Sequence, residues 1–327
     1  MILSEVKCMP YIPTGTSLED DILTANGSDF HTTTFLYGLT YTIGMLGNSS
    51  GDGTLLDPYL LMTPPEGAVV YNDDAGIGLN ALITYRAITT GTHSLEATSF
   101  DGGTGSYTIS ISAGLGTQNG DVVRGSQFAD MVNGLGGNDQ IAGLGGNDRI
   151  SGASGNDTLG GGNGADTLLG GENSDVLIGN TGNDVLHGGN HNDVIYGGPG
   201  ADILGGGFGA DRFVFQLAEH STAGSVDRIV ASEGAIAMQG VGAVGGDVID
   251  LQQIDANTTV SGNQAFVFTG GGFDSGQRSA GRVWLEEYGG RTLLRGNTDA
   301  DAQAEISIWI EDGNVAWNRY YAGDFVL

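Results

Sequence analysis

The middle of the chain is a nine-residue repeat that runs without a gap through eleven units. Glycine fills position 1, aspartate position 6 and an apolar residue position 8 of every unit, from Gly116 to Phe213. A biased composition alone would not keep the same residue type at three positions in eleven units. A flexible Gly/Asp linker would not place an apolar residue at a fixed position of each unit. The pattern predicts a solenoid in which each unit adds a polar loop of six residues and a strand of three.

The unit length predicts how the coils stack. Nine is odd and side chains alternate along a strand, so one unit makes half a coil and two units close a turn. Residues eighteen apart then lie about 4.8 Å from each other. Asp139 is therefore expected between Asp121 and Asp157 on one edge of the solenoid, with Asp130 and Asp148 on the other edge.

Carboxylates stacked in this way need a cation between them. Two carboxylates about 5 Å apart repel by roughly 3 kcal/mol at an effective dielectric constant near 20. Basic residues are scarce, with 11 Lys and Arg against 39 Asp and Glu. A hard dication relieves the repulsion, and glycine-rich loops add carbonyl oxygens to the carboxylates, as calcium prefers. The predicted ligands are Asp121, Asp130, Asp139, Asp148, Asp157, Asp166, Asp175, Asp184, Asp193, Asp202 and Asp211.

The unit resembles the nonapeptide repeat of RTX proteins, which binds calcium in a parallel β-roll. The resemblance implies an ion between stacked loops, held by aspartates and loop carbonyls. Six aspartates on one edge and five on the other leave gaps for at most nine ions. Position 4 is glycine in seven units and is replaced in the other four, by Asn119, Phe128, Asn173 and His191. If this position needs a positive φ, asparagine is tolerated there and phenylalanine is unfavourable. We therefore expect irregular sites next to Phe128 and at the first unit. The position-4 glycines of the other loops are Gly137, Gly146, Gly155, Gly164, Gly182, Gly200 and Gly209.

Composition limits the classes of partner. The formal charge of −28 argues against nucleic acid, which requires clustered Lys and Arg. A single cysteine, Cys8, excludes an internal disulfide framework. The first 30 residues lack a basic segment followed by an apolar run, and no stretch of 18 apolar residues predicts a transmembrane helix. These features favour a secreted protein exported without a cleaved N-terminal signal.

After a short extension at 1–13, residues 14–115 are predicted to form a β-sandwich. Alternating runs separated by Gly, Asn and Asp clusters are typical of one. The order of Tyr37-Gly-Leu-Thr-Tyr41, Leu56-Asp-Pro-Tyr-Leu60 and Gly105-Ser-Tyr-Thr-Ile109 resembles the bacterial pre-peptidase C-terminal domain, a jelly-roll sandwich. The resemblance implies a non-catalytic module of adhesion or recognition, with a surface glycan or a matrix polymer as ligand.

Two groups of side chains in this segment allow a functional and a structural interpretation. Asp57 and the run Asn72-Asp73-Asp74 would suit a cation site at loop ends, but Asx turns explain the same residues without a metal. Tyr59, Tyr71 and Tyr85 would suit a ligand, although half-buried tyrosines are common in strands. The structural interpretation is favoured for both.

The solenoid occupies residues 116–214, and residues 215–327 are predicted to form a β-rich cap over its end. All three tryptophans lie there, and an exposed solenoid end needs an apolar cover. Gly246-Asp-Val-Ile-Asp-Leu251 and the runs around it resemble the C-terminal domain of serralysin-type (peptidase M10) metalloproteases. The terminus Asp324-Phe-Val-Leu327 resembles the signal read by type I secretion machinery, with an ordinary final strand as the alternative. Asp299, Asp301, Gln303 and Glu305 suggest a further calcium loop, although the central glycine of an EF-hand is missing.

No catalytic constellation is found. Serralysins carry a His-Glu-x-x-His zinc helix, which this sequence lacks. His187 and His191 are four apart, but the glycines between them disfavour a helix and a shared metal. Gly47-Asn-Ser-Ser-Gly51 matches the Gly-x-Ser-x-Gly sequence of a nucleophile elbow, but a nucleophile elbow needs a helix after the serine and none is expected here.

The sequence therefore predicts an all-β, non-enzymatic, secreted calcium-binding protein. It combines a jelly-roll-like sandwich, a parallel β-roll that folds on binding calcium after type I export, and a β-rich cap. Two other classes are considered: a serralysin relative without its catalytic domain, and an accessory module of a polysaccharide-acting enzyme.

Overall fold

A computed structural model shows an all-β protein that divides into two compact units. The first comprises residues 1–116 and 128–133, and the second 117–127 and 134–327. Within the part of the chain described, no helix is long and apolar enough to cross a membrane. The described residues are 17–22, 28–47, 58–72, 81–99, 105–222, 224–232, 237–238, 246–256, 258, 264–271, 280–299, 305–311 and 319–327.

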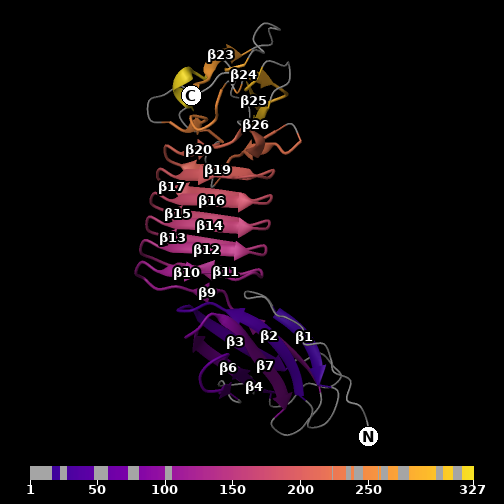
Figure 1. Ribbon diagram of the computed structural model, residues 1–327. Coiled ribbons are helices and arrows are strands. Elements are labelled where there is room, and N and C mark those ends of the chain that lie inside the picture. The colour runs from indigo at the N-terminus through magenta and orange to yellow at the C-terminus, as the bar shows by residue number, and fades with distance from the viewer. Residues whose placement is uncertain are drawn as a thin grey trace. The chain divides into compact units, whose positions relative to one another are not determined.

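The first unit is a double-sheet jelly roll, as the sequence predicts (Figure 1). In one antiparallel sheet the order is β2 (Ser28–Phe35), β7 (Gly91–Ser99), β4 (Pro58–Thr63) and β5 (Val70–Asn72). In the other it is β1 (Ser17–Ile22), β8 (Gly105–Ile111), β3 (Thr40–Gly47) and β6 (Ala81–Arg86). The short strands β9 (Gly114–Leu115) and β11 (Met131–Asn133) extend the second sheet beyond β3.

The core of the first unit lies between its two sheets. Alternate residues of β4 and β7, including Leu60, Met62 and Leu95, are fully buried, as expected for strands with one solvent-facing side. Phe35 from the first sheet stacks on Tyr41 from the second, with ring centroids 4.1 Å apart. This apolar layer contains none of the repeat aspartates, so the sandwich has a hydrophobic core of its own.

The second unit begins with two parallel sheets on opposite sides of a roll (Figure 1). One sheet contains β10 (Val122–Arg124), β12 (Gln140–Gly145), β14 (Thr158–Asn163), β16 (Val176–Thr181), β18 (Val194–Tyr196), β20 (Arg212–Val214), β22 (Val248–Asp250) and β27 (Phe325–Val326). The other contains β13 (Arg149–Ser154), β15 (Thr167–Glu172), β17 (Val185–Asn190), β19 (Ile203–Phe208) and β21 (Asp227–Ile229), and continues into the cap.

Two repeat units make one coil, as the odd unit length predicts. Leu159 pairs with Leu177 and Leu168 with Leu186, so each strand lies beside the strand eighteen residues further along the chain. The predicted strand length of three is wrong for most of the roll. Strands β12 to β17 contain six residues each, because the first three positions of the following loop also pair in register.

The apolar residues at position 8 fill the interior of the roll. Ile150, Leu159, Leu168 and Leu186 are fully buried, and all eleven members of this series are at most 4% exposed. One side chain for each half coil makes this core narrow. Most of the remaining buried side chains of the coils are aspartates, so the stability of the roll depends on how those aspartates are compensated.

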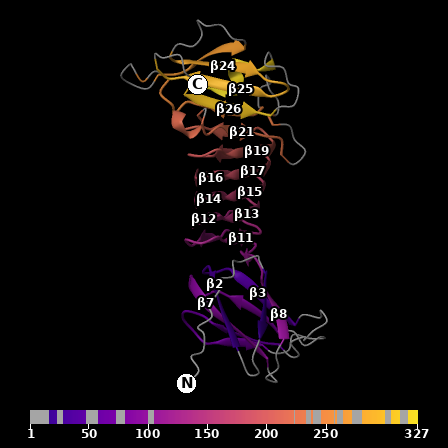
Figure 2. The ribbon, with the colours of Figure 1, turned by 90° about the vertical axis from the view of Figure 1, so that its right-hand side faces the viewer.

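The cap extends one sheet of the roll through both parallel and antiparallel strand pairs (Figure 2). After β21 the order is β26 (Ile306–Ile310), β25 (Thr292–Asn297), β24 (Arg282–Glu287) and β23 (Val267–Gly271). Two short 3-10 helices, η1 (Ala218–His220) and η3 (Ala322–Asp324), lie in this region. The final strand β27 pairs with β22, with Phe325 opposite Ile249. In the folded chain Phe325 and Val326 thus form a paired strand.

Candidate metal-binding ladders

The repeat aspartates form two hydrogen-bonded series, which we call the aspartate ladders. The backbone N–H of each aspartate donates to the Oδ1 atom of the aspartate eighteen residues later, for example Asp139 to Asp157 and Asp166 to Asp184. The N–O distances are 2.7–2.9 Å throughout. One ladder runs from Asp121 to Asp211 and the other from Asp148 to Asp202, as the eighteen-residue spacing predicts.

In seven of the ladder aspartates, named below, the second carboxylate oxygen has no hydrogen-bond partner among the described residues. These side chains are at most 1% exposed. A buried polar atom without a partner costs free energy, and a buried carboxylate costs more. An orphaned oxygen repeated at this spacing is the chemical mark of a cation site. Within the described residues the repeat aspartates with such an Oδ2 include Asp139, Asp157, Asp166, Asp175, Asp184, Asp202 and Asp211.

The glycine at position 1 leaves space for this oxygen and for a carbonyl oxygen of the next coil. A Cβ atom on Gly170 would lie 2.4 Å from both Asp175 Oδ2 and the Gly188 carbonyl oxygen. Gly179 repeats the arrangement with Asp184 and Gly197, at 2.5 Å for each. Any larger residue at position 1 would fill the space in which these oxygens meet. This explains why every unit begins with glycine.

The position-4 glycines adopt the left-handed backbone that the sequence predicts. All seven have φ between 94° and 157°. The substitutes Asn173 and His191 also have positive φ, at 78° and 75°, whereas Asn119 and Phe128 do not. A Cβ atom on Gly164 would lie 1.9 Å from the Gly146 carbonyl oxygen, so position 4 is also where neighbouring coils approach most closely.

The beginning of the repeat differs from its middle. Asp121 Oδ2 accepts hydrogen bonds from the backbone N–H of Thr117 (2.6 Å) and from its hydroxyl (3.0 Å). This carboxylate is therefore satisfied inside its own loop. Asp130 is buried, at 4% exposure, and lies in the segment 128–133 that belongs to the first unit. Both observations agree with the expectation that the first two loops are irregular.

Burial raises the pKa of the ladder carboxyls in the metal-free protein. Desolvation is the main cause, and it is partly opposed by the amide that hydrogen bonds to each carboxylate. The pKa of Asp175 and of Asp202 rises to about 7, and that of Asp184 and of Asp211 to about 6. For Asp175, Asp184 and Asp202 the neighbouring ladder carboxylate adds to the rise. A divalent cation would favour the charged form instead.

The donor set fits a hard cation. It consists of carboxylate and backbone carbonyl oxygens, the ligands of calcium rather than of softer transition metals. No cluster of three or more His, Cys, Asp or Glu side chains that could hold a metal by itself occurs among the described residues. A cation bound between these aspartates would need backbone carbonyl oxygens to complete its coordination.

Sequence reasoning missed two features of the ladders. Asp202 and Asp211 donate their amides to Asp227 and Asp247, so each ladder continues past the repeat by one aspartate. The predicted maximum of nine ions assumed ladders that end with the repeat, and it is not a limit set by the structure. The second feature is a row of asparagines at position 5, where Asn147 Oδ1 accepts the amide of Ala165 at 2.9 Å. Only Asp227-Arg-Ile229 and Asp247-Val-Ile249, which repeat the order Asp-x-apolar, signalled the extension.

The histidines of the roll have separate partners. His187 Nδ1 lies 3.0 Å from Ser232 Oγ, and His191 Nδ1 lies 3.3 Å from the Asn173 amide. The two rings thus contact different groups. In the proposed acidic loop, Glu305 Oε2 accepts a hydrogen bond from the Thr298 amide at 2.6 Å. The residues Cys8, Asn48 to Gly51, Asp57, Asp73, Asp74, Asp301 and Gln303 lie outside the described residues.

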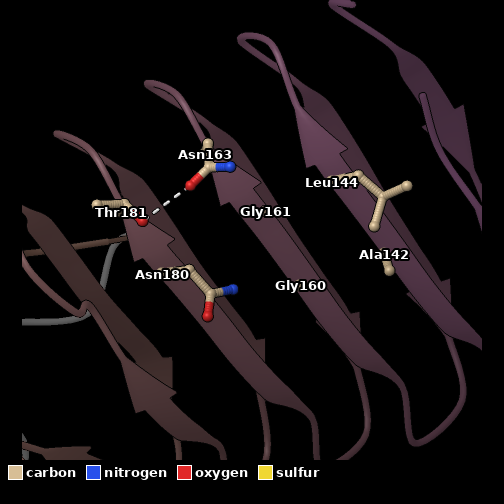
Figure 3. A pocket seen from close by; sticks show the side chains of 8 residues that line it. Ala142, Leu144, Gly160, Gly161, Asn163, Asn180 and Thr181 are labelled. Atoms are coloured by element: carbon tan, nitrogen blue, oxygen red, sulfur yellow. Dashed lines mark hydrogen bonds between the residues drawn. The ribbon is translucent and has the colours of Figure 1, made fainter. Parts of the chain in front are cut away.

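A shallow hollow of about 280 Å³ lies on the face of β12, β14 and β16 (Figure 3). It exists because Gly160, Gly161 and Gly162 carry no side chains there. The polar groups beside it include Asn163 and Thr181, which hydrogen bond to each other at 3.1 Å. None of the lining residues is ionisable, so the hollow is no candidate for the metal.

Comparison with known proteins identifies the repeat. Residues 115–213 match the family of the RTX calcium-binding nonapeptide repeat in five overlapping segments, 115–150, 134–168, 143–177, 169–204 and 178–213. The nonapeptide units are therefore RTX calcium-binding repeats, as the sequence predicts. The match ends before the cap, so the resemblance of residues 215–327 to the serralysin C-terminal domain stays a prediction.

Two solved structures are similar to parts of the chain. The pre-peptidase C-terminal domain of a Bacillus anthracis collagenase is 14% identical, with a TM-score of 0.28, and the alignment covers 33% of this chain and 98% of that one. A subunit of the mannuronan C5-epimerase of Azotobacter vinelandii is 21% identical, with a TM-score of 0.25. That alignment covers 64% of this chain and 80% of the epimerase subunit. No curated protein is a significant match.

Proposed function

We propose that the chain is a secreted, non-enzymatic protein whose roll folds when it binds calcium outside the cell. The observation that carries the proposal is the buried, partnerless Oδ2 atom on successive ladder aspartates, each beside glycine-rich loop carbonyls. Without a cation these carboxylates oppose folding. With calcium they become ligands, and the free energy of binding becomes free energy of folding.

The calcium concentration on the two sides of the membrane then determines the state of the chain. Extracellular calcium modules typically have dissociation constants of about 10⁻⁴–10⁻³ M. Such sites remain empty in a calcium-poor cytoplasm, where the roll stays unfolded and suits passage through a narrow channel. Outside the cell they fill, and the coils stack. Several ions would be bound, with the ladder aspartates as their carboxylate ligands and the position-4 glycines shaping the loops.

We propose that export uses the type I route, with the C-terminus as the signal. Phe325 and Val326 form a strand that is paired with β22 in the folded protein, and Asp324 is buried. A secretion machine could therefore read these residues only before the cap folds. This arrangement supports the proposed order of events, export first and calcium-driven folding second.

The sandwich is proposed as the recognition module, and its outer face supports this assignment. Cross-strand pairs place Phe30, Glu96, Leu61 and Tyr71 in one row across β2, β7, β4 and β5. Phe30 and Tyr71 are 46% and 65% exposed, and Tyr71 stacks on Tyr59 with ring centroids 5.9 Å apart. An exposed aromatic platform of this kind suits a surface glycan or a matrix polymer.

Calcium-dependent folding is tested on the full chain by circular dichroism. We expect the β-signal of the roll to be lost in chelator and restored by calcium but not by magnesium, which demands smaller octahedral sites. Asp166→Asn should shift the calcium midpoint upward. Glu172→Gln removes the same charge from an exposed side chain of the same roll and should not. A roll that stays fully folded after exhaustive calcium removal would falsify the proposal.

Recognition is tested separately, in calcium buffer, by pull-down with purified cell-wall polysaccharides and matrix polymers. The double variant Tyr59→Ala/Tyr71→Ala should weaken capture. Tyr37 is as exposed as Tyr71 but lies between β2 and β3, away from the row, so Tyr37→Ala is the matched control. Equal capture by the wild type and the double variant would show that this face is not the recognition surface.

A further inference from the structure

Asp227 continues one aspartate ladder into the cap. The Asp202 amide donates to Asp227 Oδ1 at 2.8 Å across 25 residues of sequence, in place of the 18 of the repeat. The strand register is nevertheless kept. Leu204 pairs with Ile229 in the way that Leu186 pairs with Leu204. Asp227 therefore occupies the position of a repeat aspartate, although it lies outside the residues that match the repeat family.

The carboxylate of Asp227 is buried, and only one of its two oxygens accepts a hydrogen bond. Its side chain is fully buried, and Oδ2 has no hydrogen-bond partner among the described residues. The basic residue beside it, Arg228, forms an ion pair with Glu311 at 2.7 Å. Asp202 is in the same state, with a partnerless Oδ2 that lies 2.4 Å from where a Cβ on Gly197 would be. Two buried carboxylates side by side with free oxygens are stable in their charged form only with a cation between them.

We propose that Asp202 and Asp227 bind a calcium ion at the junction between the roll and the cap. This inference rests on the proposed function, because it extends the same ladder and the same ion by one coil. It differs in that the last ligand comes from the cap and not from a nonapeptide unit.

An ion at this point would order the cap as well as the coil below it. The Asp227 amide donates to Ser221 Oγ at 2.9 Å, and that hydroxyl donates to the Ser307 carbonyl oxygen at 2.5 Å. Asp227 also begins β21, which pairs with β26. The antiparallel strands β25 and β24 are built on β26. Fixing Asp227 therefore fixes the strand on which the cap sheet is assembled.

The position of Trp309 makes the site directly observable. Trp309 is the cross-strand partner of Arg228, the residue after Asp227, and the repeat region contains no tryptophan. Terbium replaces calcium in oxygen-ligand sites and emits light when a nearby tryptophan transfers energy to it. We expect the full chain loaded with terbium to show emission on selective tryptophan excitation. Trp309→Phe should abolish this emission without changing the number of ions bound.

The variant Asp227→Asn tests the ligand itself. We expect loss of the tryptophan-sensitised emission and one calcium ion fewer per chain by equilibrium dialysis. The calcium concentration at the midpoint of the tryptophan fluorescence change should rise by about tenfold or more, since loss of groups that only orient metal ligands already lowers metal affinity by about that much. Glu311→Gln, which breaks the neighbouring ion pair, controls for a general weakening of the cap and should keep both the emission and the ion count. Asp166→Asn, within the repeat, should keep the emission.

Two outcomes would overturn the inference while leaving the proposed function intact. One is a wild type that binds terbium without tryptophan-sensitised emission, or with emission that survives Trp309→Phe. The other is an Asp227→Asn chain that binds as many calcium ions as the wild type. If Asp227→Asn does not fold, the wild type and Trp309→Phe decide the question. A wild type that binds no calcium at all would instead reject the proposed function.

Discussion

At the scale of single residues, the roll stores backbone strain at the second position of three of its loops. Leu135, Leu144 and Ala153 have φ of 74–80°, a region that costs side chains other than glycine about 1–2 kcal/mol. Later units place glycine or asparagine at this position, such as Gly162 and Asn180. The strain is thus confined to the N-terminal coils of the roll, and it can be relieved without touching a ladder aspartate.

Relief of this strain is the first prediction. Ala153→Gly should raise the free energy of unfolding of the calcium-loaded roll by about 1 kcal/mol, because glycine adopts this backbone without steric cost. Ala142→Gly, an alanine in β12 of the same roll without positive φ, should instead lower it by about 0.5–1 kcal/mol. Denaturant unfolding measures both values. Equal effects of the two substitutions would show that φ at residue 153 stores no strain.

The ladder carboxyls predict an unusual pH dependence in chelator. Their folded-state pKa values lie above the ordinary value of 3.8, at about 7 for Asp175 and Asp202 and about 8 for Asp227. A group with a raised folded pKa contributes stability that is complete below its unfolded pKa and is lost as the pH rises through its folded pKa. The metal-free roll, unfolded at about pH 8, should therefore gain β-structure as the pH falls to about 5.

Calcium reverses this dependence, because protons and calcium compete for the same oxygens. In calcium buffer the midpoint of folding should move to lower calcium concentration as the pH rises from about 5 to about 8. Circular dichroism in chelator and calcium titrations across this range test the two trends. A metal-free roll that gains β-structure as the pH rises would contradict the assignment of buried, neutral ladder carboxyls.

At the scale of the coil, glycine at position 4 sets how closely neighbouring loops stack. Gly164→Ala would place a methyl group 1.9 Å from the Gly146 carbonyl oxygen, on a residue with φ of 130°. We expect a loss of about 2 kcal/mol or more and a higher calcium midpoint. Gly323→Ala, where no atom lies within 4 Å, is the matched control and should be neutral. A neutral Gly164→Ala would mean that adjacent loops can separate without losing the site.

Much of the coil could be predicted from the sequence, because its period is fixed by alternation along a strand. The eighteen-residue register, the buried position 8 and the positive φ of position 4 all follow from residue type and spacing. The continuation to Asp227 and Asp247 could not, because the connecting loops lengthen the step from 18 residues to 25 and 36. The six-residue strands were also missed, since glycine is a poor strand former by propensity and pairs here only because its neighbours stack.

At the scale of the whole molecule, the two units have different sources of stability. The sandwich has an apolar core with Phe35, Tyr41 and Leu60 at its centre, whereas the interior of the roll consists of one apolar side chain and one aspartate for each half coil. The stability gained by burying apolar surface does not depend on calcium. The stability of the roll does depend on calcium, because its buried aspartates need a cation to compensate their charge.

We therefore expect two separate melting transitions by differential scanning calorimetry. Chelator should remove the transition of the second unit and leave that of the first unit in place. Tryptophan fluorescence assigns the transitions, because every tryptophan belongs to the second unit. A single transition that shifts as a whole on removal of calcium would show instead that the units unfold together.

The eighteen-residue step of the ladders also has a mechanical consequence. Each coil touches only its neighbours, so a chain pulled from its ends yields one coil at a time. Releasing eighteen residues lengthens the chain by about 60 Å, at roughly 3.3–3.6 Å for each residue, and sets free the ion held by that coil. Single-molecule stretching should give evenly spaced steps of this size in calcium and a smooth extension in chelator. A protein anchored at one end and loaded at the other would then act as a tether that absorbs force stepwise and recoils when calcium rebinds.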